Sequence, residues 1–119
     1  MRDFRQLRVW EDAHQITLEV YKLTKTFPKE ELFALTNQLR RASVSIGSNI
    51  AEGCGRGSNK DYAHFLQMAI GSAFEVDYQI YLAKDLAYIS DENYKIISGK
   101  IDSLKRQLAS LLQKVRNAS

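Results

Sequence analysis

The sequence contains little of what interrupts or crosslinks a small domain. Its 119 residues hold one proline, one cysteine and six glycines, four of which lie between Gly47 and Gly57. So little proline leaves room for long helices, because proline interrupts helices and central strands alike. The single cysteine, Cys54, excludes an internal disulfide and is typical of a protein from a reducing compartment.

Long apolar runs and a strong excess of one charge are also missing. No segment approaches the roughly 18 apolar residues of a membrane span. The first residues, MRDFRQLRVWEDAH, include no signal-peptide core. We therefore predict one soluble, cytoplasmic domain over residues 1–119, with no membrane association. Since 17 basic and 14 acidic residues leave a net charge of only +3, any nucleic-acid function depends on where the charges lie.

The sequence is rich in apolar residues that recur every three or four positions along four segments. Ser58 with Asp61 resembles a capping box, and Ser90 can cap the last segment. We predict helices at about 6–26, 29–53, 59–89 and 91–116. Short connections make consecutive helices antiparallel neighbours, so the predicted fold is all-α, an up-down-up-down four-helix bundle.

The second predicted helix ends in a small-residue stretch, QLRRASVSIGSNIAEGCGRGS, from Gln38 to Ser58. It is not a Walker loop, because Ser58 and Asn59 follow Gly57 where a lysine and a hydroxyl are needed. A stripe of small residues on the second helix and a stripe of glycine and aromatic residues on the third helix run beside the core positions. These two stripes indicate either a wide core seam or a subunit interface. The candidate interface residues are Ser43, Gly47 and Ala51 on the second helix and Gly71, Phe74, Tyr78 and Tyr81 on the third.

The predicted topology gathers residues 1–9, 53–61 and 112–119 at one end. Seven basic residues against two acidic ones leave +5 there. Such an end is either a phosphate-binding surface or an ordinary charged surface. Candidate contacts are Arg56 and Lys60, then Arg40 or Arg41, then Arg5, Arg8 and Arg116.

Three polar residues are expected to stabilise the fold and not to bind a ligand: Glu75, Asn49 and Glu52. One of Arg40 and Arg41 is expected to pair with Glu75, because a carboxylate beside the core seam needs a partner. The sequence does not show which arginine pairs.

Two short motifs are weak signals of chemistry. Glu11-Asp12-Ala13-His14 and Asp61-Tyr62-Ala63-His64 resemble the Glu-x-x-His of metal-binding bundles, but the fourth helix offers no acidic residue after Asp102. Cys54 with His64 lacks a third, orienting group. We therefore predict no enzyme, no cofactor and no metal site.

One distinctive pattern runs from Gln38-Leu39-Arg40-Arg41-Ala42 through Ser45-Ile46 to Asn49-Ile50-Ala51-Glu52-Gly53, followed by Gly71-Ser72 with Glu75. In these residues, and over nearly its whole length, the chain resembles the bacterial four-helix bundle proteins encoded in intervening sequences of large-subunit ribosomal RNA. The resemblance implies a homopentameric ring that binds nucleic acid and has no established catalytic activity. Accessory proteins of diversity-generating retroelements share the architecture and work with a reverse transcriptase.

The leading hypothesis is thus a non-enzymatic, ring-forming protein that binds structured RNA or DNA through phosphate contacts. The alternative is an adaptor whose surface docks a protein such as a reverse transcriptase or another polymerase. A metal-binding bundle is the third hypothesis.

Overall fold

The computed structural model describes residues 2–118, which form four long helices, two single 3-10 turns and no strand. This confirms the all-α class and the four helices. No helix of this part of the chain combines the length and apolarity that crossing a membrane requires. The helices are α1 (Arg8–Thr24), α2 (Leu35–Cys54), α3 (Asn59–Asp85) and α4 (Asp91–Asn117), and the turns are η1 (Phe4–Gln6) and η2 (Lys29–Glu31).

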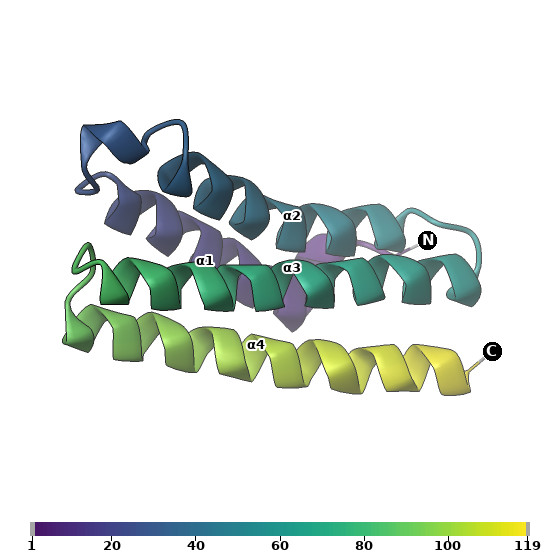
Figure 1. The fold of residues 1–119 in the computed structure, drawn as a ribbon. Coiled ribbons are helices and arrows are strands. Elements are labelled where there is room, and N and C mark those ends of the chain that lie inside the picture. The colour runs from purple at the N-terminus through teal and green to yellow at the C-terminus, as the bar shows by residue number, and fades with distance from the viewer. Residues whose placement is uncertain (1, 119) are drawn as a thin grey trace.

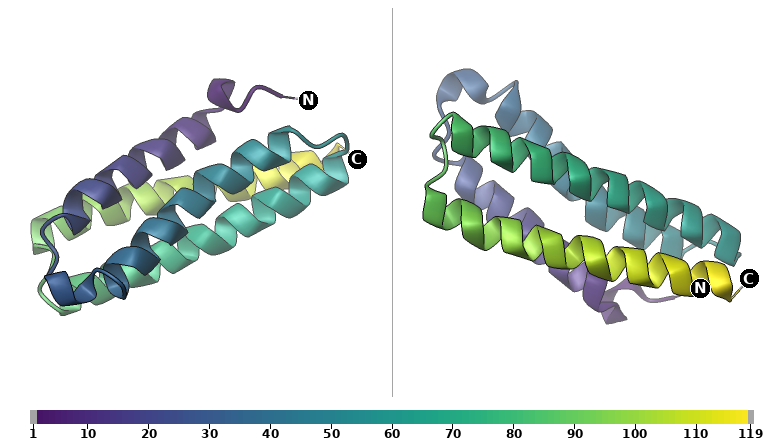
Figure 2. Two further views of the ribbon diagram at one scale, coloured as in Figure 1. Left: turned by 90° about the horizontal axis from the view of Figure 1, so that it is seen from above. Right: turned by 60° about the horizontal axis from the view of Figure 1, so that its bottom comes forward.

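Each helix lies beside the next, and α4 closes the arrangement against α1 (Figure 1). The molecule measures 46 × 24 × 20 Å. Figures 1 and 2 show the N-terminus, the α2–α3 turn and the C-terminus at the same end. We call this the basic end, formed by residues 2–9, 53–61 and 112–118. The opposite end, the loop end, is formed by residues 25–34 and 86–90.

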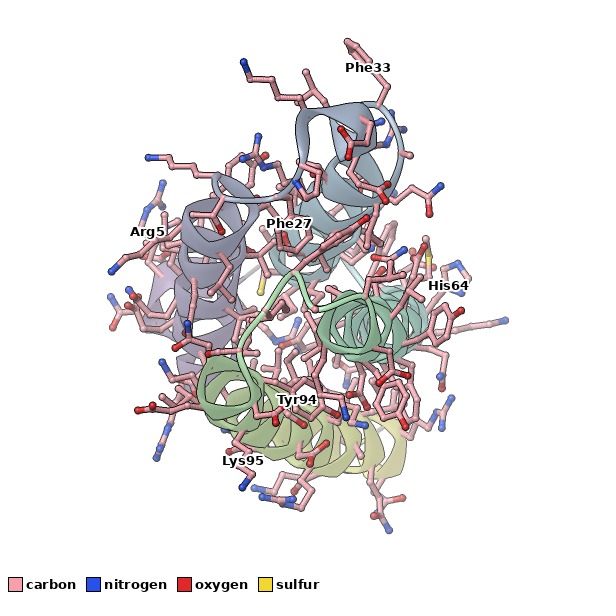
Figure 3. All side chains as sticks on the ribbon, turned by 60° about the vertical axis from the view of Figure 1, so that its left-hand side comes forward. Arg5, Phe27, Phe33, His64, Tyr94 and Lys95 are labelled. Carbon is pink, nitrogen blue, oxygen red and sulfur yellow. The ribbon has the colours of Figure 1, made fainter. Side chains whose placement is uncertain are left out.

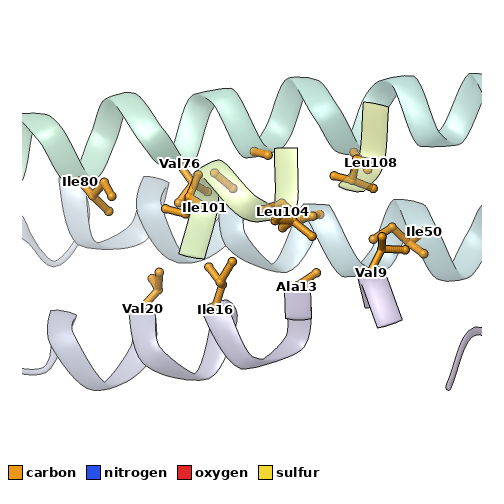
Figure 4. Packing of buried hydrophobic residues seen from close by; sticks show 14 of the residues in the cluster. Val9, Ala13, Ile16, Val20, Ile50, Val76, Ile80, Ile101, Leu104 and Leu108 are labelled. Carbon is orange, nitrogen blue, oxygen red and sulfur yellow. The ribbon is translucent and has the colours of Figure 1, made fainter. Parts of the chain in front are cut away.

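The core lies along the shared axis of the four helices. On α1, apolar residues one turn apart, among them Ile16 and Val20, face Ile101 and Leu104 of α4 (Figure 4). Fully buried alanines on α3, such as Ala73, keep that helix thin on its inner side. Close helix packing therefore follows from the predicted apolar spacing.

The second helix begins later than predicted, at Leu35 rather than near residue 29. The 3-10 turn η2 follows Pro28, and Ala34 has φ −124° and ψ −108°. Leu32 and Phe33, which the predicted helix included, are 49% and 90% exposed, so they supply no core contact to extend it. Figure 3 shows Phe33 projecting away from the loop end.

The third helix ends four residues earlier than predicted, at Asp85. Ala87 adopts the left-handed conformation with φ 64°. The Tyr88 N–H donates to the Ala83 carbonyl and the Ala87 N–H to the Lys84 carbonyl, each at 2.9 Å. This is the Schellman arrangement, which stops a helix and usually uses glycine at the left-handed position. The sequence carries no glycine here, so the earlier stop had no visible signal.

Candidate nucleic-acid interface

At the basic end three guanidinium groups lie over aromatic rings. This packing fixes where each charge sits and keeps the rings from water. The edges of two of these guanidiniums already donate to oxygen acceptors, Arg2 to Asn59 and Arg56 to Glu52, which is the geometry that phosphate recognition uses. The pairs are Arg2 over Tyr62 at 4.1 Å, Arg5 over Phe4 at 4.4 Å and Arg56 over Phe65 at 4.6 Å from the ring centroid.

The N-terminal segment is tied to the α2–α3 turn through Arg2. Its backbone N–H donates to the Cys54 carbonyl at 3.0 Å, and its guanidinium donates to Asn59 Oδ1 at 2.8 Å. Tyr62 beneath it is buried, and burial raises its pKa to about 12. Burial also raises the pKa of the Cys54 thiol, so the thiol stays protonated at neutral pH. A thiolate nucleophile is therefore not favoured here.

Three of the predicted contacts form surface ion pairs. Arg5 lies 3.6 Å from Asp3, Arg8 3.6 Å from Asp12 and Arg56 3.0 Å from Glu52. Exposed pairs of this kind contribute only about 0–1 kcal/mol, so a phosphate can replace the carboxylate at little cost. The pairing lowers the local net charge from +5 to +3 when Asp12 and Glu52 are included.

Lys60 and Arg116 differ from these three arginines. Within residues 2–118 neither has a carboxylate within 4.0 Å. Arg116 donates instead to Gln67 Oε1 at 3.4 Å, across from α4 to α3. Lys60 and Arg116 lie at the basic end beside Gln67, which was not a predicted contact. The ring contacts were likewise not predicted, although three arginines and two aromatic residues lie between residues 2 and 10.

Arg40 and Arg41 do not belong to the basic end, since they lie about 20 Å along α2 from Cys54 at 1.5 Å per residue. Arg40 Nε donates to Thr24 Oγ1 at 2.8 Å and its guanidinium lies 4.8 Å from the Tyr21 ring centroid, so it fastens α2 to α1. Arg41 is exposed.

The expected pair between Glu75 and one of these arginines is wrong. Within the described residues no ion pair joins them. Glu75 is exposed on α3, so water solvates its carboxylate and the buried charge that motivated the expectation does not exist. Its carboxylate accepts a long hydrogen bond of 3.4 Å from Gln79.

The small residues of α2 differ in burial, since Ser43 packs inside the bundle whereas Gly47 and Ala51 are half-buried. Ser43 is fully buried, and its carbonyl accepts a hydrogen bond from the Thr17 hydroxyl of α1 at 3.0 Å. A Cβ on Gly47 would lie 3.5 Å from Trp10 Nε1, an ordinary contact distance, so Gly47 lies against the indole. The predicted subunit role of Ser43 is wrong because no exposed surface remains to it. Ala51 is half-buried beside the same indole.

The two other structural polar residues lie farther along α2. Asn49 donates to the Ser45 carbonyl at 2.9 Å, and the Ser45 hydroxyl meets that of Ser72 at 2.9 Å, which joins α2 to α3. Glu52 serves as the surface partner of Arg56.

The aromatic stripe of α3 is different, because it faces water. Phe74, Tyr78 and Tyr81 are 57%, 64% and 49% exposed. A wide core seam is therefore the wrong explanation for these three. Gly71 lies on the same face, and a Cβ built there would meet nothing within 4 Å. No contact among residues 2–118 accounts for glycine at this helical position.

Comparisons with known proteins agree with this fold. The family described as 23S rRNA-intervening sequence protein matches residues 5–110. A protein of unknown function from the S23 ribosomal protein family of Bacteroides thetaiotaomicron has a similar solved structure, with a TM-score of 0.81 and 26% identity over 87% of this chain and 97% of that one. No curated protein matches. The chain therefore belongs to the family of 23S rRNA-intervening sequence proteins.

Proposed function

We propose that this chain is a non-enzymatic, cytoplasmic protein that binds structured RNA, such as ribosomal RNA, through phosphate contacts from the basic end. The observation that carries the proposal is the gathering of exposed cations from three separate segments at one end of the molecule. Structured DNA presents the same phosphate chemistry and is the second candidate ligand. The rings at this end lie under guanidiniums, which favours backbone contacts over stacking of unpaired bases.

We further propose that the protomer is an up-down-up-down bundle whose copies associate into a ring through the α3 stripe. The exposed Phe74, Tyr78 and Tyr81 support association, since tyrosine and phenylalanine are enriched at interfaces. The open space over Gly71 supports close approach of another helix. A cyclic arrangement turns every basic end to the same face and multiplies the phosphate-binding surface. The number of copies that the family resemblance implies is five.

RNA binding is tested with a labelled fragment of 23S rRNA at increasing salt concentration. The logarithm of the binding constant is expected to fall linearly with the logarithm of salt, because bound cations release counterions. The variant Arg56→Glu/Lys60→Glu should weaken binding and lower the magnitude of the salt slope by about 2 per protomer.

The matched control is Lys25→Glu/Lys95→Glu, which changes the net charge equally with two exposed lysines toward the loop end. Its binding should stay within about twofold of the unchanged protein at moderate salt. Because Arg56 also covers Phe65, thermal unfolding of each variant is measured first. Equal affinity loss in both folded double variants would reject the basic end as the contact surface.

Assembly is tested by the solution mass with and without RNA. One chain is 13.6 kDa, so five chains give 5 × 13.6 = 68 kDa. A mass of one chain at micromolar concentration would reject the ring. Tyr78→Asp, which puts a charge at the most exposed position of the stripe, should shift the mass toward that of a single chain.

A protein adaptor is the second candidate function, and one observation favours it. Phe33 is 90% exposed at the loop end beside the half-exposed Leu32, an apolar tip far from the basic end. Capture of a polymerase from nuclease-treated extract by the unchanged protein, but not by Phe33→Ser, would support this function.

A further inference from the structure

An open surface hollow of about 520 Å³ lies between the first turns of α3 and the last turns of α4. Its lining residues are Lys60, Ala63, His64, Gln67 and Arg116. Figure 3 shows His64 projecting from α3 away from the centre of the bundle. Neither His64 nor Gln67 was a predicted contact residue, and nothing described so far needs an imidazole at this place.

The polar side chains that line the hollow are all able to donate hydrogen bonds, and none is acidic. It offers a lysine, a guanidinium, an imidazole and a side-chain amide, all of which donate hydrogen bonds, and it contains no carboxylate. The two cations also lack carboxylate partners within 4.0 Å among residues 2–118, in contrast to the paired Arg5, Arg8 and Arg56. Two unpaired positive charges in one concave place attract an anion.

The donors come from two helices and converge on that place. Lys60, His64 and Gln67 are spaced four and three residues apart, so they stand on one face of α3. Arg116 approaches from α4 and already reaches Gln67 at 3.4 Å. The Lys114 and Val115 carbonyls near the end of α4 accept hydrogen bonds from the Ala118 N–H at 3.1 and 3.3 Å. The acidic neighbour Asp61 is exposed one residue before Tyr62 and does not line the hollow.

We propose that this hollow binds one phosphate group, held by Lys60 and Arg116 through charge and by His64 and Gln67 through hydrogen bonds. The proposal rests on the proposed function in assigning the ligand to a backbone phosphate of the bound RNA. Free inorganic phosphate has the same tetrahedral oxygens and enters as a probe. The site joins α3 to α4, so it makes the end of α4 part of the RNA contact surface.

The first experiment titrates inorganic phosphate at constant pH and ionic strength and follows both histidines by NMR. The chain has two histidines, so His14 is an internal control: it stacks on Trp10 at 5.0 Å on α1, outside the hollow. The His64 signals should move with saturation while those of His14 stay still. Lys60→Gln should weaken the apparent phosphate affinity severalfold, and Lys95→Gln should not. Equal movement of both histidines would indicate an unspecific ionic effect and overturn the site.

The second experiment measures RNA affinity for Gln67→Glu, which places a carboxylate in the hollow beside Arg116 and occupies it without removing a cation. Losing one phosphate contact at 0.1 M salt is expected to lower the affinity about eightfold, from a slope of roughly 0.9 per phosphate. Gln38→Glu on α2 makes the same change of charge at an exposed position and should leave affinity within about twofold.

The outcomes separate the two claims. Phosphate binding in the hollow with RNA affinity equal in both glutamate variants overturns the assignment to RNA. If the unchanged protein does not bind RNA at all, the proposed function fails, and the phosphate titration still decides whether the hollow is an anion site.

Discussion

Replacing Gly71 by alanine should change two properties in opposite directions: it should raise the stability of the single chain and weaken its association with other copies. Glycine inside a helix costs about 0.8–1.0 kcal/mol relative to alanine, and a Cβ at this position meets nothing within 4 Å. The lone protomer should therefore gain about 1 kcal/mol. At roughly 2.1 cal/mol/K per residue, unfolding 119 residues has an entropy of about 250 cal/mol/K, so the midpoint should rise by about 4 °C. If another helix packs over Gly71, the same methyl group should weaken association.

The assay combines thermal unfolding at low protein concentration with mass measurement over a concentration series. Gly99→Ala is the matched control, because Gly99 is also exposed within a helix, and a Cβ added to it would meet nothing within 4 Å. It should raise the midpoint equally and leave the mass unchanged.

Gly53→Ala should not stabilise the protein. Its Cβ would lie 3.0 Å from both Phe65 Cβ and Tyr62 Cδ1, and such crowding costs about 1–3 kcal/mol, which offsets or exceeds the gain of about 1 kcal/mol from replacing a helical glycine. Destabilisation of the dilute protein by Gly71→Ala would refute the open space assigned to this position. Stabilisation by Gly71→Ala with assembly unchanged would refute only the close approach of another helix.

Two further predictions concern the protomer. Ala87→Gly should stabilise it by about 1 kcal/mol in urea unfolding, because a left-handed φ of 64° strains alanine and glycine adopts it freely, and no gain would contradict the Schellman end of α3. Alkaline pH should destabilise the protein: burial raises the pKa of Tyr62 to about 12, so only the unfolded chain loses this proton above pH 10. Stability present below pH 10 is lost as the pH rises toward 12, by up to about 2.7 kcal/mol for two pKa units, and a Tyr62→Phe variant with an equally steep loss would contradict this origin. The raised pKa of Lys105, caused first by its hydrogen bond to Asp77, acts in the same direction.

The helices were predictable because their signals are periodic and local. Apolar spacing found α1, α3 and α4 within a few residues, and the Ser58 and Ser90 caps fixed two starts, each accepting a hydrogen bond at 3.1 Å. The start of α2 was missed because Leu32 fits the apolar period yet faces water. Whether an apolar residue is buried depends on what packs opposite it, and period alone does not contain that information.

The sequence was enough to predict where the positive charges of the candidate site gather, but not which side chains contact one another. Chain order placed Arg56, Lys60 and Arg116 at one end, since only the direction of each helix was needed. The pairing of Glu75 was wrong because a small rotation of a helix about its axis decides between core and solvent. The partner of Arg40 proved to be Thr24 on α1, and no pattern in sequence identifies a hydroxyl 16 residues away as that partner.

Each arginine that covers an aromatic ring at the basic end has two effects: it supplies positive charge and it helps to stabilise the fold. A guanidinium above Tyr62, Phe4 or Phe65 shields carbon from water while it presents charge outward. Replacing these arginines would therefore remove positive charge from the basic end and, at the same time, expose rings on η1 and α3 to water. Lys60 covers no aromatic ring among residues 2–118, so its charge can be changed without uncovering one.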